Sequence, residues 1–274
     1  GDILTIYAII GFGLIPVAKL KDSWVLIIAT LLMLQPYEWI NFACALQHPE
    51  VTPANPASWA YFGKMGEYIP KDSFIDTVVG NLTNGRPAVF NWSWENGRVF
   101  QTLSLFMLGM LAGRKGLFKE SDSNIRFWKK ALVISLVAFI PLYQAKTNVG
   151  TWYTSEALIR PLGVILSSWA NLAFMIFLVS SFVLLFRTSL FNKALNLLAP
   201  IGRMSLSNYI IQSILGSFIY YGFGLGMYQF TGATHCLIIG ICLAILQGIF
   251  STWWLHVHKQ GPLESLWHKA TWIG

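Results

Sequence analysis

The sequence predicts an all-α protein, a polytopic transmembrane helical bundle of about seven spans with one surface helix and one long outer loop. Three observations lead to this fold class. Apolar residues make up 55% of the 274 residues, charged residues only 11%, and the mean hydropathy is +0.55, whereas soluble domains carry roughly 25% charged residues. Seven apolar segments alternate with polar stretches, and the basic residues are unequally divided between the loops. We therefore expect the lipid bilayer to be the main partner.

The apolar segments are the expected spans, because one bilayer crossing needs about 20 mostly apolar residues. The second segment contains Pro36, which loosens the local helix. The predicted spans are residues 3–18, 24–46, 97–113, 128–143, 160–186, 204–228 and 233–256.

Residues 47–96 are the one long polar interruption between these segments. The stretch is rich in prolines, glycines and aromatic residues. Loops of this length are either functional or disordered, and the aromatic content argues against disorder. Since Trp and Tyr favour the headgroup level of a bilayer, we expect an ordered, partly interfacial cap.

A surface helix is predicted after the fifth span, in "RTSLFNKALNLLAP". Its apolar and polar side chains separate onto two helical faces, as in helices that lie on a membrane. The apolar face carries Leu190, Phe191, Ala194, Leu195 and Leu198, and the polar face carries Asn192, Lys193 and Asn196.

The distribution of Lys and Arg predicts the orientation, because cytoplasmic loops carry an excess of both residues. With seven spans, 13 of the 19 basic residues lie on the side that holds the tail, residues 257–274. We therefore expect a cytoplasmic C-terminus and an extracytoplasmic loop 47–96, in a bacterial inner (plasma) membrane. The six basic residues on the outer side are Lys64, Lys71, Arg86, Arg98, Lys146 and Arg160.

Several classes of site have no support in the sequence. Cys44, Cys236 and Cys242 form no CxxC pair, so neither a disulfide framework nor a metal site is expected. His256 and His258 diverge on a helix and are expected to be interfacial residues. Phosphate-binding glycine loops are absent from the sequence. The excess of basic residues follows the loops, so we predict no nucleic-acid partner.

Glu38 is the clearest candidate site inside a predicted span, where ionisable residues are costly and rare. Gln35, Glu38 and Asn41 follow at i, i+3 and i+6, so they are expected on one side of the helix. Glu38 is then either a proton-handling or substrate-binding carboxylate near the outer leaflet, or a structural partner of Arg160.

A second candidate site is "APIGRMSLSNYIIQS", at the start of the sixth span. Arg203 stands beside a helix N-terminus, which attracts anions. Asn208 and Gln212 lie on a polar stripe flanked by Tyr209. Either the segment binds an anionic ligand, or Arg203 anchors the helix at the headgroups while the stripe joins helices. We expect Arg203 beside the tail segment "GPLESLW", with Glu264 as its partner, because a half-buried guanidinium needs carboxylate or phosphate oxygens.

The stretches "GDILTIYAIIGFGLIP", "LAPIGRMSLSNYIIQS" and "GPLESLWHKATWIG" resemble the YeiB-like bacterial inner-membrane family known as domain of unknown function 418. The resemblance covers essentially the whole chain. It implies that a further N-terminal portion precedes the chain, with an Arg-Gly helix similar to that of membrane acyltransferases and a histidine near the outer membrane edge. Asp2 would lie beside that histidine.

The resemblance implies transfer of an acyl group from a cytoplasmic donor to an envelope glycan or lipid acceptor. Arg203, the helix end and Lys259 would then hold a phosphate-bearing donor such as acyl-CoA, with Asp2 and Glu38 as the catalytic candidates. A histidine general base is not visible in the predicted spans. The alternatives are a small-molecule or lipid transporter with Glu38 as the coupling residue, and a non-catalytic scaffold whose polar stripes only pack helices.

Overall fold

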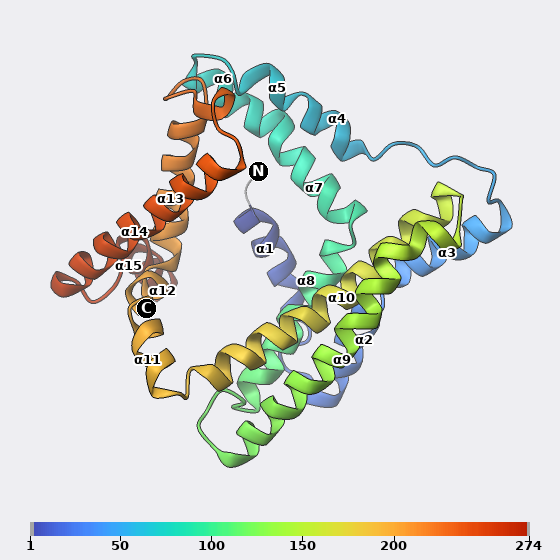
Figure 1. The fold of residues 1–274 in the computed structure, drawn as a ribbon, viewed down its shortest axis with the longest axis horizontal. Helices are drawn as coiled ribbons and strands as arrows, with labels where there is room; N and C mark the ends of the chain where they lie inside the picture. The colour runs from blue at the N-terminus through green and yellow to red at the C-terminus, as the bar shows by residue number, and fades with distance from the viewer. Residues whose placement is uncertain (1–2, 273–274) are drawn as a thin grey trace. The chain divides into compact units, whose positions relative to one another are not determined.

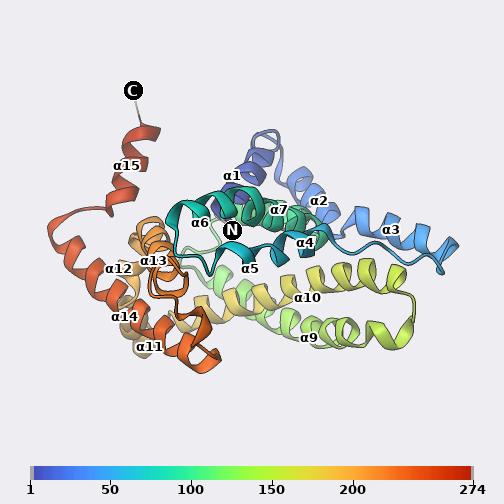
Figure 2. The ribbon, with the colours of Figure 1, turned by 90° about the horizontal axis from the view of Figure 1, so that it is seen from above.

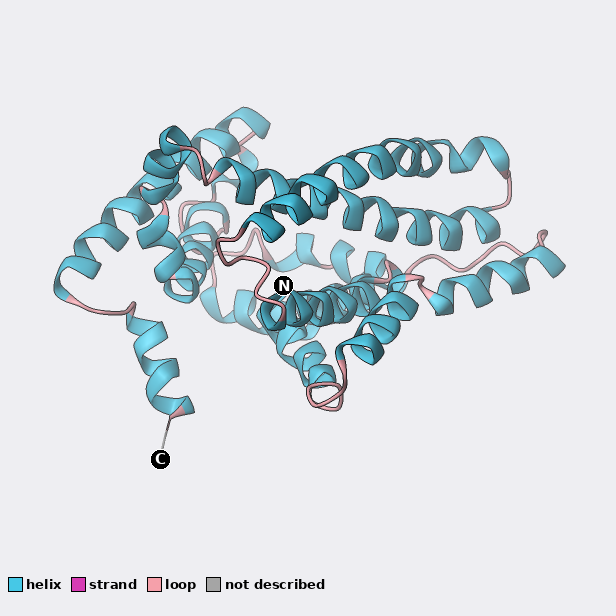
Figure 3. Cartoon of the chain, turned by 90° about the horizontal axis from the view of Figure 1, so that it is seen from below, coloured by secondary structure: helices cyan, strands magenta, loops and turns pink. Residues whose placement is uncertain are grey.

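The computed structural model describes residues 3–272, and this part of the chain consists of helices joined by turns and loops, without a strand (Figure 3). The described residues fall into two compact units. The first contains the residues up to Lys64 together with Asn81–Leu185, and the second contains Met65–Gly80 and the residues from Phe186 onwards.

The first unit is a helical bundle whose longest helices, α9 and α10, run antiparallel side by side (Figure 1 and Figure 2). Helix α2 packs on α8, α3 on α10 and α4 on α7. The helices of this unit are α1 (Ile3–Gly11), α2 (Asp22–Met33), α3 (Pro36–Gln47), α4 (Ala57–Gly63), α7 (Arg86–Glu95), α8 (Arg98–Arg114), α9 (Asp122–Trp152) and α10 (Glu156–Leu185).

The contact between α2 and α8 forms a small apolar core. Val25 and Ala29, one turn apart on α2, are fully buried against Met107 and Leu111 of α8. Ala29 is small, which lets the two helices approach closely. The Ser104 hydroxyl of α8 donates to the Ala29 carbonyl at 2.7 Å, so the interface also contains a hydrogen bond.

The second predicted span is broken in the middle. Helix α2 ends at Met33 and α3 begins at Pro36, with Gln35 between them in the left-handed region at φ 59°. A proline disfavours the α conformation for the preceding residue, which accounts for a break at this step. We expected Gln35, Glu38 and Asn41 to form a stripe on one helix. This expectation is wrong for Gln35, which lies outside both helices.

The second unit contains the C-terminal helices and two short helices from the long loop. The main-chain N–H of Gly222 donates to the Ile69 carbonyl at 2.9 Å, and a Cβ at Gly222 would collide with the Pro70 carbonyl. These contacts fix the loop segment against the turn after α13. The helices of this unit are α5 (Met65–Tyr68), α6 (Phe74–Gly80), α11 (Ser189–Asn196), α12 (Ala199–Arg203), α13 (Ser205–Tyr220), α14 (Ala233–Val257) and α15 (Pro262–Thr271).

Three helical segments among the described residues are long and apolar enough to cross a bilayer: Asp22–Gln47, Glu156–Leu185 and Ala233–Val257. They coincide with three of the predicted spans. Helix α13 has 16 residues, or about 24 Å of helix against a hydrocarbon core of about 30 Å, so the predicted span 204–228 is too long. The all-helical fold is confirmed, and the number of seven spans stays a prediction.

We expected residues 47–96 to be ordered, and the structure agrees with this. The segment contains helices α4 to α7 and a π-helical turn at Asn81–Gly85. The predicted surface helix is also present, as α11. Its position on a membrane stays a prediction.

Candidate functional site

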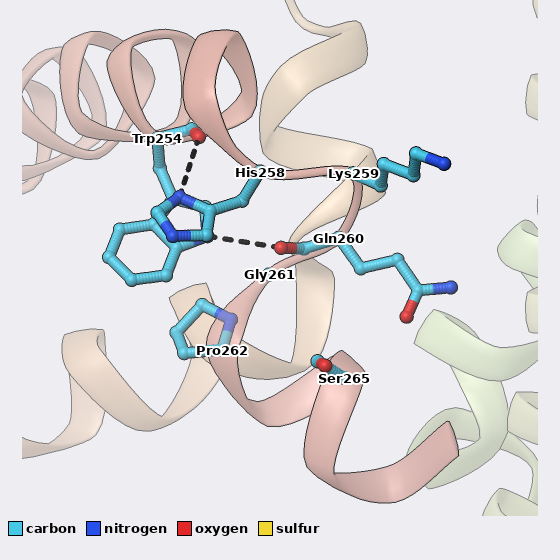
Figure 4. A pocket seen from close by; sticks show the side chains of 7 residues that line it. All are labelled: Trp254, His258, Lys259, Gln260, Gly261, Pro262 and Ser265. Carbon is cyan, nitrogen blue, oxygen red and sulfur yellow. Dashed lines mark hydrogen bonds between the residues drawn. The ribbon is translucent and has the colours of Figure 1, made fainter. Parts of the chain in front are cut away.

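The tail turn between α14 and α15 encloses a half-open hollow of about 260 Å³. Gly261 precedes α15 and Pro262 is its first residue, a position where the missing N–H of proline is harmless. A Cβ at Gly261 would collide with the Glu264 carboxylate, so a larger residue there would displace that side chain. Figure 4 shows the lining residues, which are Trp254, His258, Lys259, Gln260, Gly261, Pro262 and Ser265.

One wall of the hollow is a stack of two rings. The rings of Trp254 and His258 lie nearly parallel at 12°, with centroids 4.1 Å apart (Figure 4). The Trp254 indole N–H donates to the Gln260 carbonyl at 3.0 Å, and His258 Nδ1 lies 3.3 Å from the Trp254 carbonyl. Because a carbonyl oxygen only accepts hydrogen bonds, the latter contact places a proton on Nδ1. The Nε2 atom of His258 is then left to interact with a ligand.

Arg203 holds the same turn from α12. Its guanidinium donates to the Lys259 carbonyl at 3.0 Å, so the expected position of Arg203 beside the tail agrees with the structure. Arg203 is not one of the residues that line the hollow. Its contact fixes the backbone of Lys259, an exposed residue of the lining whose side chain extends away from the Trp254 and His258 rings (Figure 4).

Glu264 has a different partner from the one expected. Its carboxylate accepts the N–H groups of Leu206 and Ser207 at 2.8 and 3.0 Å, and also the Ser207 hydroxyl. Among the described residues no ion pair joins Glu264 to Arg203. The expected pair is wrong because a helix N-terminus offers several N–H donors to one carboxylate. Glu264 thus occupies the α13 end that we expected to receive a donor phosphate.

These hydrogen bonds determine the charge of Glu264. Burial by itself raises the pKa of the Glu264 carboxyl, but the hydrogen bonds from Ser207 and Leu206 outweigh it, and the net pKa is lowered from the ordinary value of 4.5. The Glu264 carboxylate, which caps the N-terminus of α13, is therefore ionised at neutral pH.

Asn208 lies in a buried polar contact between α13 and α14. Its side-chain NH₂ donates to the Ser251 hydroxyl at 2.9 Å and to the Ile201 carbonyl at 3.2 Å, while Gln247 donates to the Asn208 carbonyl at 2.9 Å. Such contacts join helices in apolar surroundings. The structure therefore favours the helix-joining interpretation for this part of the stripe.

The other predicted residues of this segment are not brought into that contact. Gln212 is exposed and Tyr209 is half-buried, so the stripe does not extend beyond Asn208. Asp2 lies outside the described residues.

Glu38 is buried, with 7% of its surface exposed, as expected for a carboxylate that faces protein. Its described polar contact is the Asn41 side chain, at 3.3 Å on the same helix. Arg160 instead binds Glu156 at 3.1 Å and the Ala54 carbonyl at 2.8 Å. The expected pair of Glu38 with Arg160 is therefore wrong, because Arg160 has a nearer carboxylate one turn away on its own helix.

The sequence did not single out the buried role of Gln35. Its side-chain NH₂ donates to the Gly97 carbonyl and to the Ser168 hydroxyl, both at 2.9 Å, which joins the α2–α3 break to α8 and α10. The side-chain carbonyl of Gln35 is buried without a hydrogen-bond partner among the described residues. The Gln-Pro pair inside an apolar segment was the signal for this break.

Comparison with known proteins places the chain in a family. Residues 112–274 match the family model described as "Protein of unknown function (DUF418)", and this match covers more than half of the chain. The chain belongs to the DUF418 family. The resemblance seen in the sequence is thereby confirmed, and the tail turn, Arg203 and Asn208 lie within the matched residues, whereas Gln35 and Glu38 lie outside them.

Three relatives match this DUF418 chain. The uncharacterized protein YxaH of Bacillus subtilis (strain 168) is 28% identical over 286 residues, covering 100% of this chain and 66% of YxaH. The uncharacterized protein YeiB of Escherichia coli (strain K12) is 35% identical over 74 residues, covering 27% of this chain and 19% of YeiB. An uncharacterized 39.9 kDa protein encoded in the amylase 3′ region of Bacillus acidopullulyticus is 26% identical over 191 residues, covering 64% of this chain and 53% of that protein.

The chain spans less than two thirds of the length of these curated relatives. No solved structure matches the chain.

Proposed function

We propose that this DUF418 chain belongs to a multi-pass protein of the bacterial inner (plasma) membrane that transfers an acyl group from a cytoplasmic donor to an acceptor in the envelope. The observation that carries the proposal is the hollow of the tail turn, which has Lys259 among its lining residues and comes directly after a helix of spanning length. In the proposed seven-span topology this turn is cytoplasmic, where a donor arrives, and loop 47–96 faces the acceptor.

Within this proposal Lys259 supplies a positive charge to a phosphate-bearing donor such as acyl-CoA, and Arg203 positions Lys259 through its carbonyl. The α13 helix end, which Glu264 occupies, has no part in donor binding. Glu38 is the catalytic candidate among the described residues, since acyl transfer to a hydroxyl needs a base within hydrogen-bond reach.

The test is mass spectrometry of envelope lipids and glycans from a strain that lacks the gene. We expect one acylated species to disappear and to return with the wild-type gene. Arg203→Ala should be expressed but fail to restore the species, because it removes the hydrogen bond to the Lys259 carbonyl that positions Lys259. Lys193→Ala, an exposed lysine on α11, serves as the matched control and should restore it. An unchanged envelope in the deletion strain would refute acyl transfer.

The break at Gln35 favours a second candidate, a small-molecule or lipid transporter. Interrupted helices inside a membrane are typical of transporter binding sites, and Asp22–Gln47 is interrupted at this residue. Glu38 would then be the coupling carboxylate. Transport would be supported if the acylated lipids and glycans of the envelope were unchanged in the deletion strain and the cellular level of a metabolite rose or fell. The third alternative, a scaffold, is favoured by the helix-joining role of Asn208.

A further inference from the structure

The hollow of the tail turn lies at the end of an exposed apolar row that is long enough to cross the hydrocarbon core of a bilayer. We propose that its phosphate-bearing ligand is an anionic glycerophospholipid of the membrane, with the headgroup in the hollow and the acyl chains along α14. The inference rests on the proposed function, because it concerns the same phosphate site. It assigns the phosphate to a lipid of the bilayer and not to a soluble donor.

The first support is the exposed surface of α14. Residues four apart on a helix form a row, and one such row is exposed along α14 and ends one residue before His258. From its first to its last residue the row extends about 30 Å, the thickness of the hydrocarbon core. Its members are Leu237, Ile241, Ile245, Ile249, Trp253 and Val257.

The second support is the size of the hollow. Sites for whole drug-sized or cofactor-sized molecules measure about 300–1,000 Å³, whereas this hollow measures about 260 Å³. A phospholipid headgroup fits this volume, since its acyl chains remain outside along α14. A nucleotide coenzyme is larger, because its base, sugar and phosphates would all have to lie in or around the same volume. The size of the hollow therefore favours the lipid headgroup.

The third support is the charge of the turn. The ionised carboxylate of Glu264 is directed to two N–H groups and a hydroxyl of α13, and the positive end of the α13 dipole offsets part of its negative charge. Basic side chains at a membrane surface attract anionic lipids. From Trp254 to Thr271 these basic side chains are the lysines Lys259 and Lys269.

The lining groups suit both parts of such a headgroup. The Lys259 ammonium can donate to phosphate oxygens, and with the proton of His258 on Nδ1, its Nε2 atom can accept from a headgroup hydroxyl. The Ser265 hydroxyl also lines the hollow. Phosphatidylglycerol combines a phosphodiester with hydroxyl groups and is therefore the probe of choice.

Native mass spectrometry of the purified full chain, loaded with either phosphatidylglycerol or phosphatidylcholine, tests the proposal. We expect the chain to retain phosphatidylglycerol in preference to phosphatidylcholine. The double variant His258→Ala/Lys259→Ala should lower this retention by about tenfold, since it removes a charge-assisted hydrogen bond and a second polar contact. The matched control Lys193→Ala/His235→Ala removes exposed residues away from the turn and should retain the lipid, and gel filtration verifies that both variants are folded.

Coenzyme A, added in a second arm, distinguishes the two sources of phosphate. The lipid proposal is overturned, while acyl transfer stands, if binding of coenzyme A depends on His258 and Lys259 but retention of phosphatidylglycerol does not depend on them. Equal retention of phosphatidylglycerol by both double variants, or no preference over phosphatidylcholine, also overturns it. Envelope chemistry of the deletion strain tests the proposed function separately.

Discussion

Single carboxylates in this chain act as caps for helix ends. Glu264 on α15 accepts the first N–H groups of α13, and Glu95 on α7 accepts both the N–H and the hydroxyl of Ser58 near the start of α4. The first N–H groups of a helix have no partner within the helix. Each carboxylate therefore fixes the position of a helix far away in the sequence.

Glu264→Gln tests the first of these caps. The amide keeps the size of the side chain but removes the charge, so the hydrogen bonds to Leu206 and Ser207 weaken. We expect the free energy of unfolding to fall by about 1–2 kcal/mol, measured by thermal unfolding in detergent. Glu120→Gln, at an exposed glutamate, should leave the unfolding temperature unchanged. Equal unfolding temperatures for Glu264→Gln and the wild type would show that the cap contributes nothing.

The same cap predicts a pH dependence. The pKa of Glu264 is lower in the folded chain than its ordinary value of 4.5, so the unfolded state binds a proton first as the pH falls. The stabilisation is complete above that ordinary value and is lost as the pH falls through the lowered pKa of the folded state. The difference in unfolding temperature between wild type and Glu264→Gln should therefore shrink in acid. A difference that grows there would contradict the assignment.

At the scale of an element, the break between α2 and α3 depends on a close contact with the start of α8. Gly97 has a φ of +63°, and a Cβ there would lie 2.6 Å from Gln35 Oε1 and 2.7 Å from a methyl carbon of Val164. Glycine adopts this conformation without strain. The position thus requires glycine for both its backbone conformation and its space.

Gly97→Ala should destabilise the first unit. The backbone strain alone costs about 1–3 kcal/mol, and the displaced Gln35 also loses its bond to the Gly97 carbonyl. Gly109→Ala, within α8, is the matched control, because a Cβ there meets no atom within 4 Å. Fluorescence-detected gel filtration should show a loss of folded protein for Gly97→Ala only. Equal profiles for the two variants would refute the tight contact.

The helices were predictable from the sequence, but several partners were not. The apolar segments at Asp22–Gln47, Glu156–Leu185 and Ala233–Val257 were evident from hydropathy. Pairing by charge assigned Glu264 to Arg203 and Glu38 to Arg160, and both pairs were wrong. Main-chain N–H and C=O groups are strong partners that a count of charged residues leaves out, and here they bind both Glu264 and Arg203.

At the scale of the whole molecule, the orientation in the membrane stays a prediction that labelling can test. Because 13 of 19 basic residues lie on the tail side in a seven-span topology, we expect Asp72→Cys to react with an impermeant maleimide in intact cells and Lys269→Cys to react only after lysis. Both positions are exposed. The background chain has Cys44, Cys236 and Cys242 replaced by Ser. Labelling of Lys269→Cys in intact cells would reverse the topology.

The hydrogen bond between Gly222 and Ile69 has a consequence for the order of synthesis. The ribosome completes residues 65–80 well before it makes residues 221–222, so the early segment has no docking partner for most of translation. Until then its backbone groups must be satisfied by water or by other contacts. A chain that terminates at Leu185 would therefore leave this segment without its docking partner, and protease should cut it between Met65 and Gly80, where the complete chain is protected.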